Sequence, residues 1–373
     1  MSVQTERAVD YRFKFLYAIG MIIVVCCHSD GGGLNLFYDW FSPYAYVLAL
    51  FVFCSGYFYR DGSETDLGAY LLRKVKRLLV PLYLWNCFYA LLVLVLRPLG
   101  FSIGLAPSFR TLVLMPLYEG SQFEYNLGSW FVAPLFFLEL FNVLFRRVFR
   151  VAGSRRRELA AFAAYLLLGV LGIYLARSGF RRGWEQTLVR SLYFLPFYGL
   201  GLLYRRVLER YDTLPHAVYF AVVLLLQYVL IIVVGHVPAY TISLCDNFND
   251  GLLTPFITGA LGIAFWLRVA RLVESTLARD KCFNAIADNT FSIMTNHFLG
   301  FMLVKAGFAF LKRTTSHCQA FDMELFRSDL VYFYLPGGKL FTLFYVAAGL
   351  AVPILMQKLV DRVKRLLFTR PTT

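Results

Sequence analysis

Ten long apolar runs, separated by shorter polar segments, dominate the pattern along the chain. A helix of ~17–25 mostly apolar residues spans the hydrocarbon core of a bilayer. By this criterion the runs are 13–29, 42–59, 78–97, 127–145, 159–176, 188–204, 216–235, 251–268, 290–310 and 338–357. The pattern predicts an all-α fold, a polytopic membrane helix bundle of about ten transmembrane helices, with residues 1–373 forming one domain. No internal repeat is visible, which weakens the case for an inverted-repeat transporter.

Lysine and arginine residues fall in short clusters between the apolar runs. Ten spans place both termini on one side of the membrane. If that side is the cytosol, the inner segments carry 26 of the 37 lysine and arginine residues. Because positive charge in short loops orients membrane helices toward the cytosol, we expect both termini to be cytoplasmic.

Composition narrows the choice of partners. The chain is 59% hydrophobic and only 16% charged, against ~25% charged residues in a soluble domain. The net charge of +14 would suit nucleic acid, but the cations are spread between apolar runs, so the expected partner is the lipid bilayer. No cysteine and histidine residues show metal-site spacing, and no metal is expected. A disulfide between Cys245 and Cys318, both in predicted outer loops, is left open.

Two histidines lie in or at the end of an apolar run. His28 closes the first run, in RFKFLYAIGMIIVVCCHSD, and His297 lies inside the ninth, in NTFSIMTNHFLGF. An ionisable group at such a position is a functional candidate, and a neutral imidazole readily takes a proton from a hydroxyl near pH 7. The alternatives are a headgroup-level side chain for His28 and an interhelical hydrogen bond for His297.

A basic run, RKVKR at residues 73–77, precedes the third apolar run. It either fixes topology and binds anionic headgroups or clamps the phosphates of a cytosolic donor. Helical spacing would put residues 74 and 77, or 73 and 77, on one face. Glu139, inside the fourth run, is expected to form a structural ion pair or to serve a proton path. No Walker, GxSxG or HExxH sequence is present, so ATP-driven transport and soluble-type hydrolysis have no support.

Five stretches carry more specific patterns: AIGMIIVVCCHSDGG, LFVFCSGYFY, KVKRLLVPLYLW, LGSWFVAPLFFLEL and DNTFSIMTNHFLGF. In this order they resemble the motifs of spans one to four and of a late span in the acyltransferase-3 family. Its members are integral-membrane O-acyltransferases that modify bacterial cell-surface sugars. The first two stretches together are fairly specific, and each of the other three is weak alone.

The resemblance implies that the protein is a transferase of the bacterial cytoplasmic (inner) membrane. It would pass an acyl group, usually acetyl, from cytosolic acyl-coenzyme A to a hydroxyl of a sugar or glycan at the outer side. His28 matches the essential first-span histidine of the family, and His297 matches the late-span histidine. The acceptor (exopolysaccharide, O-antigen, peptidoglycan-linked sugar or small metabolite) and the acyl group (acetyl or succinyl) stay open.

The same resemblance assigns the donor site. Lys74 and Arg77, with Arg73 beside them, match the basic residues thought to hold the coenzyme A phosphates. Ser55, Gly56 and Tyr57 match an SGY triplet, for which we expect a role in helix packing and pore shape. The chain departs from the family at Tyr17, where many members have Arg or Lys eleven residues before the histidine. Arg12 and Lys14 are the nearest cations in the sequence and the candidates to replace it.

The mechanism that follows is general-base acyl transfer. The acyl arm would reach from Lys74 and Arg77 to His28, whose imidazole would deprotonate the acceptor hydroxyl. Glu139, Tyr57 and the Ser292/His297 pair are candidates for support, and a covalent acyl-histidine relay is an alternative.

Two other functions compete with the enzyme: a non-enzymatic exporter or flippase of a glycan intermediate, and a signalling or scaffold protein. A His28→Ala variant that loses the acyl label while export continues would favour the enzyme over the exporter.

Overall fold

The structure, a computed structural model, describes residues 9–29, 39–60, 62–151 and 154–368. Within these ranges the chain forms helices and no β-strand, and a single antiparallel bridge joins Thr241 to Asp246. The all-α prediction is therefore confirmed. The α-helices, in chain order, are α1 (Tyr11–Cys27), α2 (Pro43–Tyr57), α3 (Leu67–Lys74), α4 (Val80–Leu96), α5 (Met115–Tyr118), α6 (Val132–Val148), α7 (Arg155–Arg177), α8 (Trp184–Leu203), α9 (His216–Val234), α10 (Thr254–Leu272), α11 (Lys281–Asp288), α12 (Thr290–Thr314), α13 (Met323–Ser328) and α14 (Thr342–Phe368).

Short helical segments of other types extend or link several of these helices. Two of the π-helices continue a longer helix: η1 joins α3 to α4, and η5 continues α8. These segments are η1 (Val75–Leu79), η2 (Arg97–Leu99), η3 (Arg110–Leu114), η4 (Glu124–Phe131), η5 (Tyr204–Leu208), η6 (Glu209–Tyr211), η7 (Ile242–Leu244), η8 (Leu277–Arg279) and η9 (Gly338–Phe341).

Each of the ten predicted runs overlaps one α-helix. Within the described ranges, seven helical segments are long and apolar enough to cross a membrane: Leu67–Leu99, Glu124–Val148, Arg155–Arg177, His216–Val234, Thr254–Leu272, Thr290–Thr314 and Gly338–Leu366. The protein is thus a polytopic membrane protein. The crossings by α1, α2 and α8 remain predictions, as does the side on which the termini lie, because residues 1–8 and 369–373 are outside the described ranges.

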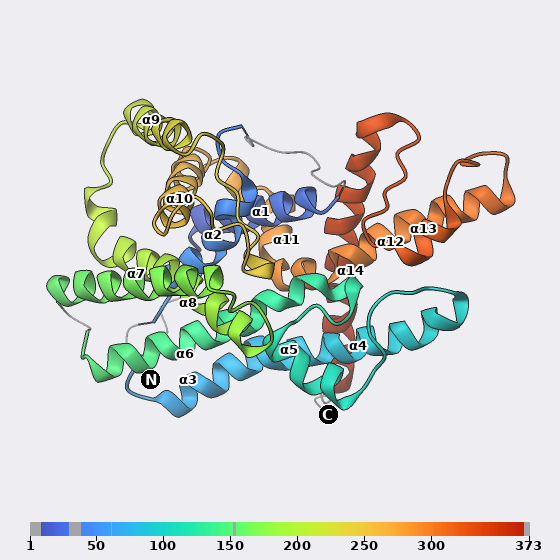
Figure 1. Ribbon diagram of the computed structural model, residues 1–373, viewed down its shortest axis with the longest axis horizontal. Helices are drawn as coiled ribbons and strands as arrows, with labels where there is room; N and C mark the ends of the chain where they lie inside the picture. Colours follow the sequence, from blue (N-terminus) through green and yellow to red (C-terminus); the bar gives the residue numbers. More distant parts are fainter. Residues whose placement is uncertain (1–8, 30–38, 61, 152–153, 369–373) are drawn as a thin grey trace, which may run out of the picture.

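The first helix lies at the centre of the bundle (Figure 1). α1 contacts α2, α10, α11, α12 and α14, and 12 of its 17 residues are buried. By contrast, the only buried residues of α9 are Val223 and Gln227, so α9 lies at the periphery. A helix that is apolar on most sides is typically enclosed by others, which agrees with the burial of α1.

Glycines bring several helices into close contact. A Cβ atom on Gly56 of α2 would lie 2.1 Å from the Tyr198 carbonyl oxygen of α8, and one on Gly201 of α8 would lie 2.1 Å from the Phe53 carbonyl oxygen of α2. Small residues at such positions let membrane helices approach closely. The glycine of the SGY triplet therefore serves helix packing.

Candidate active site

The structure brings the two predicted histidines together, although 269 residues separate them in the chain. His28 follows the last residue of α1, and His297 lies in the second turn of α12. Their ring centroids are 5.1 Å apart, with an interplanar angle of 34°. Phe298 packs against both rings, at 5.2 Å from His28 and 4.3 Å from His297. His297 is fully buried.

Backbone hydrogen bonds define which nitrogen of each ring is available for chemistry. His28 Nδ1 lies 2.9 Å from the Val24 carbonyl oxygen, and His297 Nδ1 lies 2.9 Å from that of Ile293. Since a carbonyl oxygen only accepts hydrogen bonds, Nδ1 must carry the proton in both rings. In the neutral imidazole, Nε2 then holds the free lone pair. His297 Nε2 is buried and has no hydrogen-bond partner among the described residues.

Polar and close contacts fix α12 around His297. Tyr89 of α4 donates a 2.7 Å hydrogen bond to Asn296 Oδ1, and Ser292 donates one of 2.8 Å to the Pro353 carbonyl of α14. A Cβ atom on Gly300 would lie 2.5 Å from the Ala348 carbonyl oxygen, so α12 and α14 meet closely one turn beyond the histidine. These contacts hold the ring of His297 in place.

The position of His28 across the membrane stays a prediction. A residue at the end of the first span is expected near the far membrane surface. In the structure His28 contacts His297, and α12 continues for 17 residues beyond His297, a distance of ~25 Å at 1.5 Å per residue. His297 is buried inside the bundle, and half-buried His28 lies beside it. Asp30, in the HSD sequence, lies outside the described residues.

A second polar cluster surrounds Glu139 of α6. Lys74 Nζ lies 2.6 Å from Glu139 Oε1, and Arg77 lies within electrostatic reach of the same carboxylate. Glu139 Oε2 is buried without a hydrogen-bond partner among the described residues. The structural ion pair expected for Glu139 is therefore present. Its partner is Lys74, whereas Arg146 pairs with Glu158.

The basic run itself is split between the cluster and the surface. Arg73, Lys76 and Arg77 are exposed, and Lys74 is half-buried. The run crosses from α3 into η1, where Val80 N–H bonds to the Val75 carbonyl, five residues back. This π-helical turn, a feature common at functional sites, changes the α-helical spacing that the sequence argument assumed. Lys74 and Arg77 nevertheless lie near the same carboxylate.

Tyr17, where a cation was expected, lies at this cluster. Its half-buried side chain is close to the Ser55 hydroxyl and within electrostatic reach of Arg77 and Glu139. The substitutes considered for the missing cation have other partners: Lys14 pairs with Asp288, and Arg12 pairs with Asp10 and Glu209. A positive charge within electrostatic reach of Tyr17 thus comes from Arg77, on η1.

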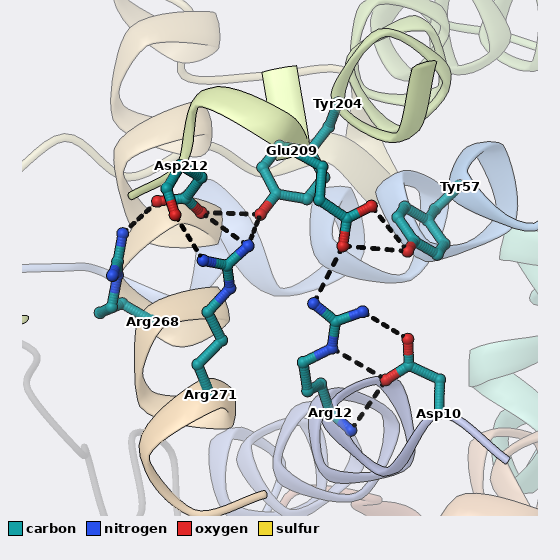
Figure 2. A network of polar contacts seen from close by, with 8 residues as sticks. All are labelled: Asp10, Arg12, Tyr57, Tyr204, Glu209, Asp212, Arg268 and Arg271. Carbon is teal, nitrogen blue, oxygen red and sulfur yellow. Dashed lines mark hydrogen bonds and ion pairs between the residues drawn. The ribbon is translucent and has the colours of Figure 1, made fainter. Parts of the chain in front are cut away.

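Figure 2 shows the network that holds Arg12. Arg12 bonds to Asp10 through Nη2 at 2.7 Å and to Glu209 through Nη1 at 2.9 Å. Tyr57 of the SGY triplet donates a 2.9 Å hydrogen bond to the same Glu209. Next to it, Asp212 binds Arg268 and Arg271 of α10. The network fastens α1, α2, η6 and α10 to one another.

The cysteines of the loops are free thiols. Cys245 is buried and Cys318 is half-buried, and neither forms a disulfide. Burial raises the pKa of Cys245 to about 11, so this thiol is protonated and unreactive at neutral pH.

Comparison with known families agrees with the resemblance seen in the sequence. Residues 10–358 match the family described as an acyltransferase domain, the acyltransferase-3 family. The chain belongs to the acyltransferase-3 family. No curated protein and no solved structure gives a significant match.

Membership in the acyltransferase-3 family identifies the protein as a membrane acyltransferase. Among the described residues, no group of three or more histidine, cysteine, aspartate and glutamate side chains is arranged to hold a metal ion. Two features of the site are not apparent in the sequence: that Lys74 is the ion-pair partner of Glu139, and that Tyr17 lies within electrostatic reach of Arg77. A carboxylate inside an apolar run was the only signal for the first, and the sequence held no signal for the second.

Proposed function

We propose that the protein is an O-acyltransferase of the bacterial cytoplasmic membrane. It transfers an acyl group, acetyl in the simplest case, from cytosolic acyl-coenzyme A to a hydroxyl of a cell-surface sugar or polysaccharide. The observation that carries the proposal is the contact between two imidazoles, half-buried His28 and buried His297, each with Nδ1 bonded to a backbone carbonyl. Two neutral imidazoles with free Nε2 atoms suit proton transfer to and from reacting groups.

The first step is the activation of the acceptor. His28 takes the hydroxyl proton on Nε2 as the oxygen attacks the thioester carbonyl carbon, and a C–O bond forms. Collapse of the tetrahedral intermediate breaks the C–S bond, and the proton returns from the imidazole pair to the coenzyme A sulfur. The products are the O-acylated sugar and free coenzyme A. His297, in contact with His28, is the second proton carrier.

The donor site in this proposal is the cluster around Glu139. Arg73, Lys74 and Arg77 would hold the coenzyme A phosphates, since charge-assisted hydrogen bonds to phosphate oxygens are strong. In the structure Lys74 is held by Glu139, while Arg73 and Arg77 form no ion pair with described residues. Tyr17, beside Arg77, is 11 residues before His28 on α1. With its phosphates at the cluster, the acyl-bearing arm of coenzyme A would have to span ~16 Å to bring the thioester to the imidazoles.

Family membership supports acyl transfer in general. The identities of the donor, acyl-coenzyme A, and of the acceptor, a sugar hydroxyl, are what we propose. In the test, membranes with and without the protein are supplied with acetyl-coenzyme A that carries a label in its acetyl group. Surface glycans are then analysed by mass spectrometry. We expect label and the mass of an acetyl group on the glycan only when the protein is present. Glycans that are identical in both samples would refute the proposed acceptor. If the protein releases no coenzyme A from acetyl-coenzyme A with any glycan added, the proposal that it is an O-acyltransferase of glycans is refuted.

A further inference from the structure

A groove between α6 and α8 lies away from the histidines. It has a volume of about 330 Å³ and is lined by Phe137, Leu138 and Phe141 of α6 and by residues of α8 from Trp184 to Leu195. Its polar side chains are Thr187 and Ser191, and both hydroxyls already donate to backbone carbonyls, of Leu117 and Thr187 respectively. The lining therefore offers apolar contacts and no unsatisfied polar group.

The groove extends over one half of a membrane. Eleven residues of α8 separate Trp184 from Leu195, which corresponds to ~16 Å along the helix. That is about half of the ~30 Å hydrocarbon thickness of a bilayer. Leu188 and Phe141 on its rim are exposed, at 49% and 39%. The groove thus has the length and the polarity of a site for the tail of a lipid in one leaflet.

A second, polar pocket of about 700 Å³ adjoins the groove, and Trp184 lines both. Arg110, Arg181 and Arg182 line this pocket together with a single acidic residue, Glu119. Arg181 pairs with Asp246 and Arg110 bonds to the Tyr118 hydroxyl. Arg182 is exposed and forms no ion pair with any described residue. The pocket has an excess of positive charge.

The position of Trp184 relates the two cavities to the membrane. It is the first residue of α8, 54% exposed, and its ring lies 5.4 Å from that of Tyr118. Tryptophan and tyrosine prefer the headgroup level of a bilayer, where the ring is apolar and its edge is polar. An apolar groove on the membrane side and a basic pocket on the water side then match the two parts of one amphiphile.

We propose that α6 and α8 bind a membrane lipid with an anionic phosphate headgroup. The tail lies in the groove from Trp184 to Leu195, and the phosphate is bound by Arg110 and Arg182. Backbone and guanidinium donors at a membrane surface recognise phosphate strongly. This site is independent of acyl transfer, because none of its residues belongs to the histidine pair or to the cluster around Glu139.

The test measures bound lipid directly, by native mass spectrometry of the detergent-solubilised protein titrated with phosphatidylglycerol or phosphatidylethanolamine. We expect phosphatidylglycerol to bind at least tenfold more tightly. Arg182→Gln should weaken it about fivefold, and the double variant Arg110→Gln/Arg182→Gln about twentyfold. Arg313→Gln, an exposed arginine at the end of α12, is the matched control and should leave binding unchanged.

A groove-filling variant tests the tail. Leu188→Trp should weaken phosphatidylglycerol binding several-fold while the thermal unfolding temperature stays the same. Glycerol phosphate, which has the headgroup and no tail, should fail to displace the lipid at equal concentration. Equal binding of the two lipids, or full displacement by glycerol phosphate, would overturn the proposal: the first indicates unselective lipid contact and the second a site for free phosphate.

Discussion

The two ends of α1 differ in how completely their polar groups are satisfied. At its start, the Nε, Nη1 and Nη2 atoms of Arg12 all donate to carboxylates, at 3.0, 2.9 and 2.7 Å. At its end, His28 meets His297, whose Nε2 is buried and has no partner among the described residues. A buried polar atom without a partner costs free energy. Other such atoms occur among the described residues, including Nε of Arg268 and Arg271, so it is the contact with a second imidazole that makes His297 Nε2 a candidate for proton transfer. The difference separates a structural network from a candidate reaction centre.

The largest effect is expected at the histidine end. His28→Gln keeps a polar side chain of similar size but removes the proton acceptor, so the rate of acyl transfer should fall by about 10²–10⁴-fold. The thermal unfolding temperature should stay the same. His317→Gln, in an exposed loop, is the matched control. A rate within twofold of the parent would show that His28 is not the base.

A substitution in the polar network at the start of α1 should lower the stability of the protein without changing the rate of acyl transfer. Asp212→Asn leaves Arg268 and Arg271 without their carboxylate, and loss of one partner of a buried pair costs ~3 kcal/mol. We expect a loss of that size in the free energy of unfolding, with an unchanged rate per folded molecule. Glu274→Gln, exposed just after α10, should change stability by less than ~0.5 kcal/mol. Loss of activity in folded Asp212→Asn would break the comparison.

Close packing of α12 against α14, and no ion pair among the described residues, holds the helix that carries His297. Gly300→Ala would place a Cβ atom 2.5 Å from the Ala348 carbonyl oxygen, and such overpacking costs ~1–3 kcal/mol. Gly307, two turns further along α12, has nothing within 4 Å of the corresponding position. Gly307→Ala should therefore raise stability by up to ~1 kcal/mol. Thermal unfolding in detergent measures both, and equal effects would show that the α12–α14 contact is looser than described.

The smallest expected effect concerns the basic run. Arg77→Gln should raise the KM for acyl-coenzyme A about tenfold, equivalent to ~1.4 kcal/mol, with little change in kcat. Lys76→Gln, in the same run and also exposed, should have no such effect. Steady-state kinetics with acetyl-coenzyme A decide between the two. If both variants behave alike, the run binds headgroups and does not select a donor.

Much of the fold was predictable, because apolar runs of membrane length have one stable solution, the helix. The runs that became α7 and α9 are bounded as predicted to within a few residues. The contact between His28 and His297 was not predictable, since it depends on how α1 packs against α12. Nor was the π-helical turn at Val75–Leu79, which no residue pattern marks.

The candidate site was predictable only as separate residues. His28 and His297 were each recognisable as an ionisable residue in or at the end of an apolar run. A single sequence, however, does not show whether two positions 269 residues apart are in contact. The same reason hid the approach of Tyr17 to Arg77. Contacts between distant segments depend on helix packing, through glycines such as Gly56 and Gly300, and packing becomes visible only in three dimensions.

The most direct test of the account is a double-variant cycle on the two histidines. The rate of acyl transfer is measured for His28→Gln, His297→Gln and the double variant, each reconstituted at equal folded concentration. Residues that act as a unit show strongly non-additive effects. The account predicts that each single variant loses most of the activity and that the double variant is hardly slower than His28→Gln. Independent losses that multiply in the double variant would contradict it.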